Sequence, residues 1–336
     1  MNTFMIYGAA GYTGGMAAEH SASAGLDLVL AGREQDRMKL EALADRLGAG
    51  VKLFSLDDPD GIATGLAGVS VLLNAAGPFA DTAEPLMSAA IGAGVHYLDF
   101  SAELDTYREA LALDARARAA GTMLLPGSGG SVAMLGSLAG HAVARVKNAR
   151  KISIALHVAG AMSRGSAISA SQSIAPATLR LVNGELVMRS TNEIRDFDFG
   201  FGLQSSFPVT LPDLLTISHA TGVPEIETFV HISAGAFPTG KIEDLPVGPS
   251  FEEREASRYR AAVEVTDADG TVVHSVLDSV NGYTFTAMAA AEAARRVIDG
   301  EFRVGFQTPV GLFGHGFAET IADTRIINSQ EKQHVA

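Results

Sequence analysis

The stretch Phe4-Met5-Ile6-Tyr7-Gly8-Ala9-Ala10-Gly11-Tyr12-Thr13-Gly14 decides the fold of this chain. An apolar run leads into three glycines spaced Gly-x-x-Gly-x-x-Gly, and a helical pattern follows as far as Ala24. The order strand, tight turn and helix start leaves backbone N–H groups at the positive end of a helix, where a pyrophosphate binds without a charged side chain. The spacing differs from the strict Gly-x-Gly-x-x-Gly fingerprint, but the flanking strand and helix supply the context that the motif requires. The residues expected to contact a dinucleotide here are Gly8, Ala10, Gly11, Tyr12, Thr13 and Gly14.

The second apolar strand, residues 26–33, ends in Arg33. A dinucleotide-binding fold places at this point the side chain that reads the ribose of the adenosine. A carboxylate there would accept from both ribose hydroxyls and select NAD, whereas a guanidinium pairs with the 2′-phosphate of NADP. Arg33 therefore predicts NADP(H) as the cofactor. An arginine that caps the strand and faces solvent is the structural alternative.

Strands and helices alternate up to residue 127, a pattern typical of a parallel sheet covered on both faces. Further helices are expected at 36–47, 59–66, 83–93 and 104–120, and further strands at 51–55, 69–74, 96–100 and 122–125. The fold class is therefore α/β, with an N-terminal Rossmann-like doubly wound parallel sheet.

The pattern changes after residue 127, where hairpins replace helical crossovers. Asn183-Gly184 joins strands 178–182 and 185–189 in a predicted type I′ turn, and Asp267–Gly270 joins strands 260–266 and 271–277. These hairpins predict a second α+β domain built on an antiparallel or mixed sheet. We expect a dinucleotide-binding domain at 1–127 and a substrate or dimerisation domain at 128–304. The C-terminal segment at about 305–330 can pack back onto the first domain.

The fourth predicted strand runs into Asn74-Ala75-Ala76-Gly77-Pro78-Phe79 at the carboxyl edge of the sheet, where ligands of open α/β sheets bind. Small side chains would let the ribose and nicotinamide lie against the backbone, so Ala75, Ala76, Gly77 and Pro78 are expected to contact the cofactor. An ordinary strand-to-helix turn is the alternative. After the third strand, Asp57 or Asp58 would contact the adenine amine or cap the next helix.

Candidates for proton transfer follow the fifth strand, where Tyr97, Asp99 and Glu103 lie near the same edge. The alternative, which we favour, is that Asp99 caps the next helix and Tyr97 packs in the core. In the second domain we single out His157, Arg164 and Tyr283, and Arg164 would hold an acidic group of a substrate. The glycine-rich run 126–131 would form a second nest of N–H groups, or a domain junction in which Ser131 caps a helix.

Composition excludes several other functions. The formal charge is −13 and no basic run occurs, which argues against nucleic acid as a partner. The chain contains no cysteine, so disulfides, thiolate metal sites and cysteine nucleophiles are excluded, and no metal site is expected. No signal-like segment and no uninterrupted apolar stretch long enough to span a bilayer is found, so we expect a cytoplasmic protein with no membrane partner.

Together these motifs resemble the saccharopine dehydrogenase-like NADP-binding oxidoreductase family, including its bacterial trans-acting enoyl reductase branch. The segments that carry the resemblance are 8–14, 31–33, 74–79 and 94–99, with shorter likenesses at 163–166 and 305–309. The resemblance implies a Rossmann domain, a following α/β substrate domain, and hydride chemistry with NADP in the cleft between them. The chain departs from the family at Gly15-Met16, where a basic residue is frequent, at Ala102, where glycine is usual, and in the run 126–130.

The function expected from these observations is an NADPH-dependent oxidoreductase that transfers hydride to a C=C (enoyl) or C=N substrate. The alternative is a non-catalytic NADP(H)-binding redox sensor or regulatory protein. The closely spaced Phe197, Phe199, Phe201 and Phe207 favour an apolar or thioester-linked small molecule as substrate, although they can equally form core or an interface. We also expect a homodimer.

Overall fold

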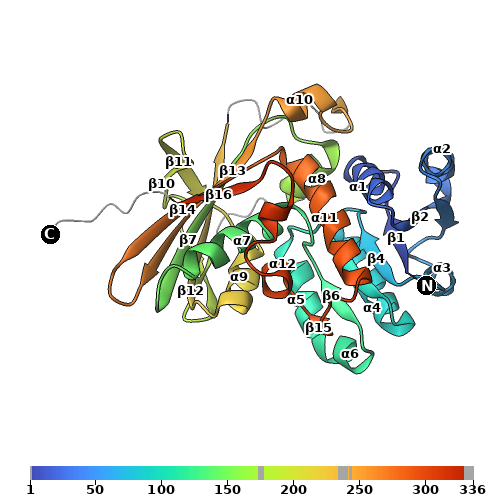
Figure 1. Ribbon diagram of the computed structural model, residues 1–336, viewed down its shortest axis with the longest axis horizontal. Helices are drawn as coiled ribbons and strands as arrows, with labels where there is room; N and C mark the ends of the chain where they lie inside the picture. Colours follow the sequence, from blue (N-terminus) through green and yellow to red (C-terminus); the bar gives the residue numbers. More distant parts are fainter. Residues whose placement is uncertain (1, 173–177, 234–240, 242–243, 329–336) are drawn as a thin grey trace.

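The fold is taken from a computed structural model that describes residues 2–172, 178–233, 241 and 244–328. Two sheets stand side by side in Figure 1, and helices fill the space between them. Within the described residues, no helix combines the length and the apolar character that crossing a membrane requires.

Sheet A contains seven parallel strands in the order β15-β6-β5-β4-β1-β2-β3, which confirms the Rossmann-like prediction. Its strands are β1 (Thr3–Tyr7), β2 (Asp27–Gly32), β3 (Gly50–Leu53), β4 (Val71–Asn74), β5 (His96–Asp99), β6 (Met123–Leu125) and β15 (Gly305–Phe306). The side chains of β1 alternate between two buried clusters: Phe4 and Ile6 face one, and Met5 and Tyr7 face the other. Burial on both faces explains why this strand is apolar at every position.

Helices cover both faces of sheet A. The N-terminal helices are α1 (Tyr12–Ser23), η1 (Glu34–Asp36), α2 (Arg37–Leu47), α3 (Pro59–Leu66), α4 (Phe79–Ala93), α5 (Leu104–Ala112) and α6 (Asp114–Ala119). α1 and α2 pack on the face that carries Phe4 and Ile6, together with α11 (Gly282–Ile298), which lies beside α1 (Figure 1). α3, α4, α5 and α6 cover the other face.

Sheet B is mixed, as predicted for the second domain. Its main path is β10-β11-β12-β7-β13-β14-β16, in which only β12 and β7 run parallel among the described strands, and the β8–β9 hairpin joins it at β12. The strands are β7 (Ala149–Val158), β8 (Thr178–Val182), β9 (Glu185–Arg189), β10 (Arg195–Asp198), β11 (Leu203–Pro208), β12 (Glu225–Ile232), β13 (Tyr259–Asp267), β14 (Val272–Ser279) and β16 (Arg325–Asn328). Asn183 and Gly184 adopt φ values of 52° and 81°, as a type I′ turn requires.

One helix, α7 (Gly130–Val143), links the two sheets because it contacts β7, β13 and β14 on one side and α11 on another. The remaining helices are α8 (Arg164–Gln172), α9 (Asp213–Thr221), α10 (Phe251–Glu255), α12 (Pro309–Phe313) and η3 (Ala318–Thr320). After α11 the chain returns to both sheets, since β15 pairs with β6 and β16 pairs with β14.

The predicted single helix at 104–120 is wrong. The chain forms two helices, α5 and α6, with Leu113 between them. The turn brings the Asp114 carboxylate to the Phe306 N–H group of β15, which donates to it at 2.7 Å. Sequence periodicity did not reveal this break because the contact that fixes it comes from a strand nearly two hundred residues later.

Candidate functional site

The glycine turn after β1 is built so that side chains would not fit. Gly8 has φ = 87°, and a Cβ atom there would lie 2.8 Å from the nitrogen of Ala76. A Cβ atom on Gly14 would collide with the Gly8 carbonyl oxygen. The turn is closed by the Gly11 N–H group, which donates to the Gly8 carbonyl at 3.0 Å. These contacts press the turn against the loop after β4 and bring the start of α1 close to β1.

The N-terminus of α1 has no side-chain cap. Gly11 is the N-cap residue, is exposed, and offers no side chain to accept from the first turn. No side chain caps this turn, in which Tyr12 and Thr13 are half-buried. Four N–H groups at a helix start lack partners within the helix, so this end has donors and positive dipole available for an anion. The strand-turn-helix geometry expected from the sequence is therefore present, and no side chain caps the first turn of α1.

Arg33 lies at the carboxyl end of β2 beside the open side of the turn. Its side chain is 60% exposed and its Nε atom lies 3.3 Å from Asp36 Oδ2. The pKa of the Tyr7 hydroxyl is raised by burial, and the charges of Arg33, Asp36 and Asp57 also act on it, so these side chains gather around the end of β1. Asp57 is exposed, whereas Asp58 caps α3 by accepting from the Gly61 N–H group at 3.0 Å. The Arg33 guanidinium and Asp57 thus lie near the end of β1.

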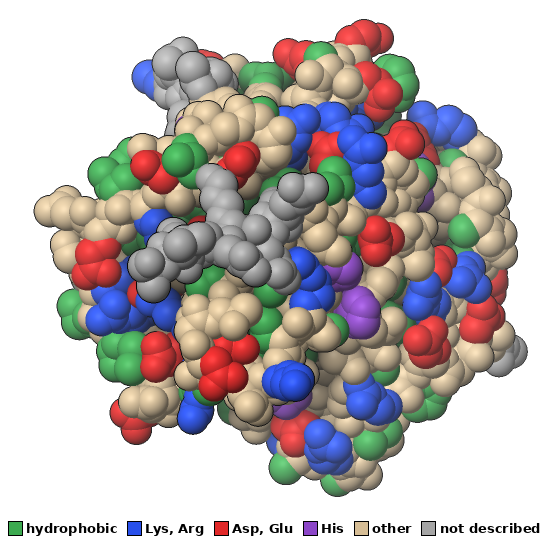
Figure 2. All heavy atoms as spheres, turned by 60° about the vertical axis from the view of Figure 1, so that its left-hand side comes forward, with side chains coloured by type: hydrophobic (Ala, Val, Ile, Leu, Met, Phe, Trp, Pro, Cys, Tyr) green, Lys and Arg blue, Asp and Glu red, His purple; other side chains and the backbone are tan. Residues whose placement is uncertain are grey.

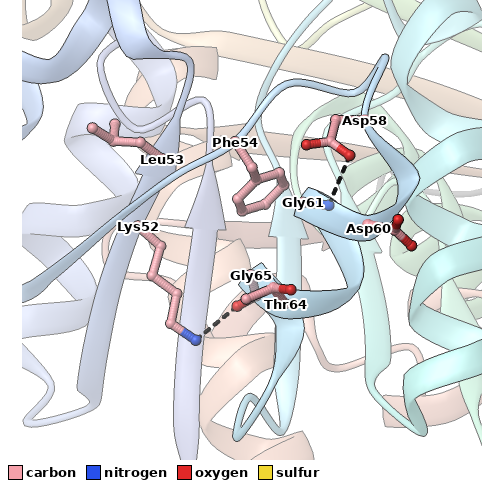
Figure 3. Close-up of a pocket in the computed structure, with 8 residues that line it drawn as sticks. All are labelled: Lys52, Leu53, Phe54, Asp58, Asp60, Gly61, Thr64 and Gly65. Atoms are coloured by element: carbon pink, nitrogen blue, oxygen red, sulfur yellow. Dashed lines mark hydrogen bonds between the residues drawn. The ribbon is translucent and has the colours of Figure 1, made fainter.

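A separate hollow of about 500 Å³ lies beside α3 (Figure 3). Lys52 of β3 reaches along it to the Gly65 carbonyl oxygen, at 2.7 Å. The carboxylates of Asp58 and Asp60 lie at the opposite end in the view of Figure 3. Two carboxylates disfavour a phosphate group, and the hollow lies at α3 rather than at the glycine turn, so we do not assign the cofactor to it.

Asn74, the last residue of β4, is fully buried and forms hydrogen bonds that fix the loop after this strand. Its Nδ2 group donates to Thr82 Oγ1 at 3.0 Å and to the Tyr97 hydroxyl at 3.2 Å, and its Oδ1 atom accepts from the Ala76 N–H group at 3.0 Å. Ala75, Ala76, Gly77 and Pro78 are half-buried or exposed beside Gly8. The predicted small-residue loop and the glycine turn thus form one continuous backbone surface.

Tyr97 and Asp99 form a buried polar network under that surface. The Tyr97 hydroxyl donates to Asp99 Oδ2 at 3.0 Å, and Asp99 Oδ1 accepts from the N–H groups of Ser101 at 2.9 Å and Gly127 at 2.7 Å. Burial raises the pKa of Asp99 to about 6 and that of Tyr97 well above its usual value. Both side chains are fully buried, and Asp99 binds the loops after β5 and β6 rather than capping the next helix. Their contacts fix loop positions.

Glu103 and Arg164 also contact backbone groups. The Glu103 carboxylate accepts from the N–H groups of Phe79 at 3.3 Å and Ala80 at 2.9 Å, so it caps α4. Arg164 donates from Nε to the Leu245 carbonyl at 2.9 Å, and its Nη2 group contacts the same oxygen. The Arg164 guanidinium thus holds the chain around residue 245, in place of the acidic substrate group suggested by its sequence position.

His157 and Tyr283 lie apart from each other. The His157 ring lies in sheet B against Phe199 and Phe201, with Nε2 2.7 Å from Ser233 Oγ, and burial lowers its pKa to about 4. The Tyr283 ring, at the start of α11, meets the Tyr12 ring edge-on at 5.4 Å. Only Tyr283 of this pair borders the glycine turn.

The run 126–131 connects β6 to α7 and packs closely against its neighbours. Gly127 has φ = 66°, and a Cβ atom there would collide with the Tyr107 hydroxyl. At Gly129 a Cβ atom would lie 2.6 Å from the Thr286 carbonyl of α11. α7 starts after Gly129 without a side-chain cap, so this helix start also leaves backbone N–H groups without a capping side chain. Ser131 is not the N-cap residue.

Sequence reasoning missed several residues that organise this region: Asn74, Tyr107, Pro249 and Arg254. Asn74 carries a readable signal, since it is the polar last residue of an otherwise apolar strand. Pro249 and Arg254 carry none, because they meet Tyr12 from more than two hundred positions away in the sequence.

Comparisons with known proteins agree with this geometry. Residues 4–125 match the family model described as the saccharopine dehydrogenase NADP binding domain. No protein of curated function matches the chain. The structure of saccharopine dehydrogenase (L-Glu forming) from Saccharomyces cerevisiae is similar over 97% of this chain and 99% of that one, with a TM-score of 0.68 and 12% identity. GenD2 from gentamicin A biosynthesis, solved in complex with NAD, reaches a TM-score of 0.48 at 16% identity over 97% of this chain and 96% of that one.

The N-terminal domain therefore matches the saccharopine dehydrogenase NADP binding domain, and the chain as a whole shares the fold of the yeast enzyme. The family match covers the N-terminal domain, and the structural likeness to the yeast enzyme extends the shared fold over nearly the whole chain.

Proposed function

We propose that this chain, whose residues 4–125 belong to the saccharopine dehydrogenase NADP-binding domain family, is an NADPH-dependent oxidoreductase. The observation that carries the proposal is the open N-terminus of α1 in a turn that admits only glycine at Gly8 and Gly14, with Arg33 at the end of the neighbouring strand. When bound, NADPH supplies the hydride, and the protein orients the two reactants and excludes water.

The residues proposed to hold the cofactor are those at three neighbouring strand ends. The N–H groups of the first turn of α1 would take the diphosphate, Arg33 the 2′-phosphate, and Asp57 the adenine. The loop 75–78 would support the ribose and nicotinamide. The full proposed set is Gly8, Ala10, Gly11, Tyr12, Thr13, Gly14, Arg33, Asp57, Ala75, Ala76, Gly77 and Pro78.

Among the catalytic candidates, we propose supporting roles. Tyr97 and Asp99 hold the loops after β4, β5 and β6 at fixed distances, Glu103 fixes the start of α4, and Arg164 fixes the chain at residue 245. A hydride acceptor with a polarised double bond needs little further protein chemistry once it is oriented beside the nicotinamide. We propose that the acceptor is a C=C (enoyl) or C=N group.

An apolar or thioester-linked substrate and a homodimer are further proposals, supported by the phenylalanines of the second domain. Phe197 and Phe199 are buried in a cluster on sheet B, so they act as core. Phe201 and Phe207 are 46% and 50% exposed and are available to a ligand or a second copy. On the face seen in Figure 2, basic and acidic side chains are interspersed, which fits a small-molecule substrate better than nucleic acid.

Residues 1–127, with the segment at about 305–330 returning to them, are proposed as the nucleotide-binding unit, and 128–304 as the substrate unit. The pairing of β15 with β6 supports the return of the C-terminal segment to the first unit, whereas β16 (Arg325–Asn328) pairs with β14 in sheet B, so the end of the segment joins the second sheet. The contact of α11 with α1 means that the substrate unit also contributes to the covering of sheet A. We place the protein in the cytoplasm as part of the same proposal.

The direct test is a titration with NADPH and NADP, followed by NADPH oxidation with a panel of enones, enoyl thioesters and imines. Turnover with one member supports the enzyme. Tight binding that differs between NADPH and NADP without turnover of any panel member would favour the alternative, a redox sensor. Failure to bind either nucleotide would contradict both.

A further inference from the structure

A segment of the second domain, residues 244–256, crosses the start of α1. The Tyr12 hydroxyl donates to the Pro249 carbonyl oxygen at 2.5 Å and accepts from Arg254 Nη1 at 2.7 Å. Arg254 Nη1 also lies 3.1 Å from the Pro249 carbonyl. A Cβ atom on Gly248 would lie 2.6 Å from the Tyr12 ring, so only glycine permits the chain to approach so closely. The segment is therefore fitted to Tyr12 by both shape and hydrogen bonds.

The other end of this segment is fixed by α8. The Arg164 N–H group donates to the Val247 carbonyl at 3.3 Å, and the Arg164 guanidinium holds the Leu245 carbonyl. Just before Arg164, the Ser163 N–H group donates to the Tyr283 hydroxyl at 2.7 Å. Tyr283 in turn packs edge-on against Tyr12. The contacts form a closed circuit that runs from α1 through α11 and α8 to the segment and back to α1.

Within the described residues, the polar contacts of the Arg254 guanidinium are those with the Tyr12 hydroxyl and the Pro249 carbonyl. Its Nε atom is buried without a hydrogen-bond partner among the described residues, so Nη1 provides the polar anchoring. Burial raises the pKa of the Tyr12 hydroxyl, which keeps it protonated and able to donate to Pro249. A hydrogen bond from a guanidinium is charge-assisted and stronger than one between neutral groups.

Tyr12 is also the first residue of α1, and its backbone N–H group belongs to the proposed diphosphate cradle. A change at its hydroxyl therefore acts on the turn that would hold the nucleotide. We propose that residues 244–256 form a strap across the cofactor cradle, and that Tyr12 and Arg254 form the clasp that slows the departure of NADP(H). Arg254 is a positioning residue, acting through Tyr12. The inference about departure rests on the proposed function, whereas the clasp itself is independent of it.

The experiment compares wild type, Tyr12→Phe, Arg254→Met and the double variant as full chains. Tyr12→Phe keeps the ring that packs on Tyr283 and Gly248 but removes both hydroxyl contacts. Arg254→Met removes the contacts of the guanidinium with the Tyr12 hydroxyl and the Pro249 carbonyl, and leaves the hydrogen bond from Tyr12 to Pro249 in place. The matched control is Tyr7→Phe, whose hydroxyl donates within sheet A to the Phe54 carbonyl at 3.3 Å and does not touch the strap. Thermal unfolding verifies that each variant is folded.

Two readouts are measured: amide hydrogen exchange of peptides that cover 244–256, without nucleotide, and NADPH dissociation by stopped-flow fluorescence. We expect faster exchange in these peptides and about tenfold faster dissociation for each single variant, since one charge-assisted contact is lost. The effect of the double variant should be smaller than the two single effects combined, because the contact between Tyr12 and Arg254 is lost in both single variants. Arg254→Lys, which retains one donor, should recover part of the difference.

The outcomes separate this inference from the proposed function. If wild type does not bind NADPH, the proposed function fails, and the exchange of 244–256 still tests the clasp. If NADPH binds and Tyr12→Phe leaves both exchange and dissociation at the level of Tyr7→Phe, the clasp is overturned. Faster exchange with unchanged dissociation would overturn the role in holding the nucleotide.

Discussion

Replacing Arg33 by serine tests whether a single guanidinium selects NADPH. The side chain is 60% exposed, and within the part of the chain that the structure describes its one ion pair is to Asp36 at 3.3 Å, so its removal should leave the fold intact. The expected loss is specific, because NADH carries no 2′-phosphate and would make no contact with this group.

The magnitude follows from the type of contact. A hydrogen bond to a charged group contributes about 1.5–3 kcal/mol, and exposure to solvent and competition with Asp36 reduce the contribution of this one to about 1–2 kcal/mol. NADPH should therefore bind to Arg33→Ser about 5–30-fold more weakly, whereas NADH affinity should change by less than about twofold. Asp36→Asn should act in the opposite direction, since it releases the guanidinium from its competing carboxylate.

The assay is equilibrium titration of nucleotide fluorescence at low and at high salt. The matched control is Arg46→Ser, because Arg46 is 63% exposed and forms a similar ion pair with Glu19 away from the proposed site. Salt should reduce the preference of wild type for NADPH. Equal losses for NADPH and NADH, or a loss as large in Arg46→Ser, would refute the assignment of Arg33 to the 2′-phosphate.

Two further substitutions test a buried carboxylate in α9 and the carboxylate that caps α4. Asp213, at the start of α9, is fully buried with both carboxylate oxygens unpartnered among the described residues, and burial raises its pKa to about 7. Because the pKa of Asp213 is higher in the folded state, the free energy of unfolding falls as pH rises from about 4 to about 7. Asp213→Asn should therefore stabilise the protein by about 2–4 kcal/mol at pH 8 and have little effect at pH 4. Denaturant melts that show the same difference at both pH values would disprove this. Glu103→Gln should lower stability by about 1 kcal/mol through the weaker cap on α4 while NADPH affinity stays within about twofold, and a large loss of affinity by titration would instead place Glu103 on the ligand.

The sequence was sufficient for the first domain because its signals are local. Gly8 and Gly14 are required by contacts within the turn and with the loop after β4. The spacing of the glycines, together with the apolar run before them and the helical pattern after them, therefore predicted the strand-turn-helix unit. The hairpin at Asn183-Gly184 was predictable for the same reason, since the turn needs two residues that tolerate positive φ. Because β1 is buried on both faces, its sequence is a continuous apolar run, and such runs indicate a parallel sheet.

The same reasoning could not assign the polar residues of the site, because their partners are distant in sequence. Arg164 looked available to a substrate until the structure placed the Leu245 carbonyl against it. Asp99 looked like a helix cap, but its partner is Gly127 on the loop after the next strand. The contact between Tyr12 and Arg254 joins residues whose proximity depends on how the two sheets are docked, and no local pattern encodes that docking.

The most direct test of the central claim is an NADPH titration of wild type and Gly11→Asp. Gly11 is the exposed N-cap of α1 with an extended backbone, where aspartate is favoured as a cap. A Cβ atom there would lie 3.2 Å from the Gly8 carbonyl oxygen, which is a tight contact, so thermal unfolding first verifies that the variant is folded. Its carboxylate would occupy the N–H groups that are proposed to take the diphosphate. We predict that wild type binds NADPH and that Gly11→Asp loses about 100-fold or more in affinity. Equally tight binding of NADPH by the folded variant, or none by wild type, would contradict the account.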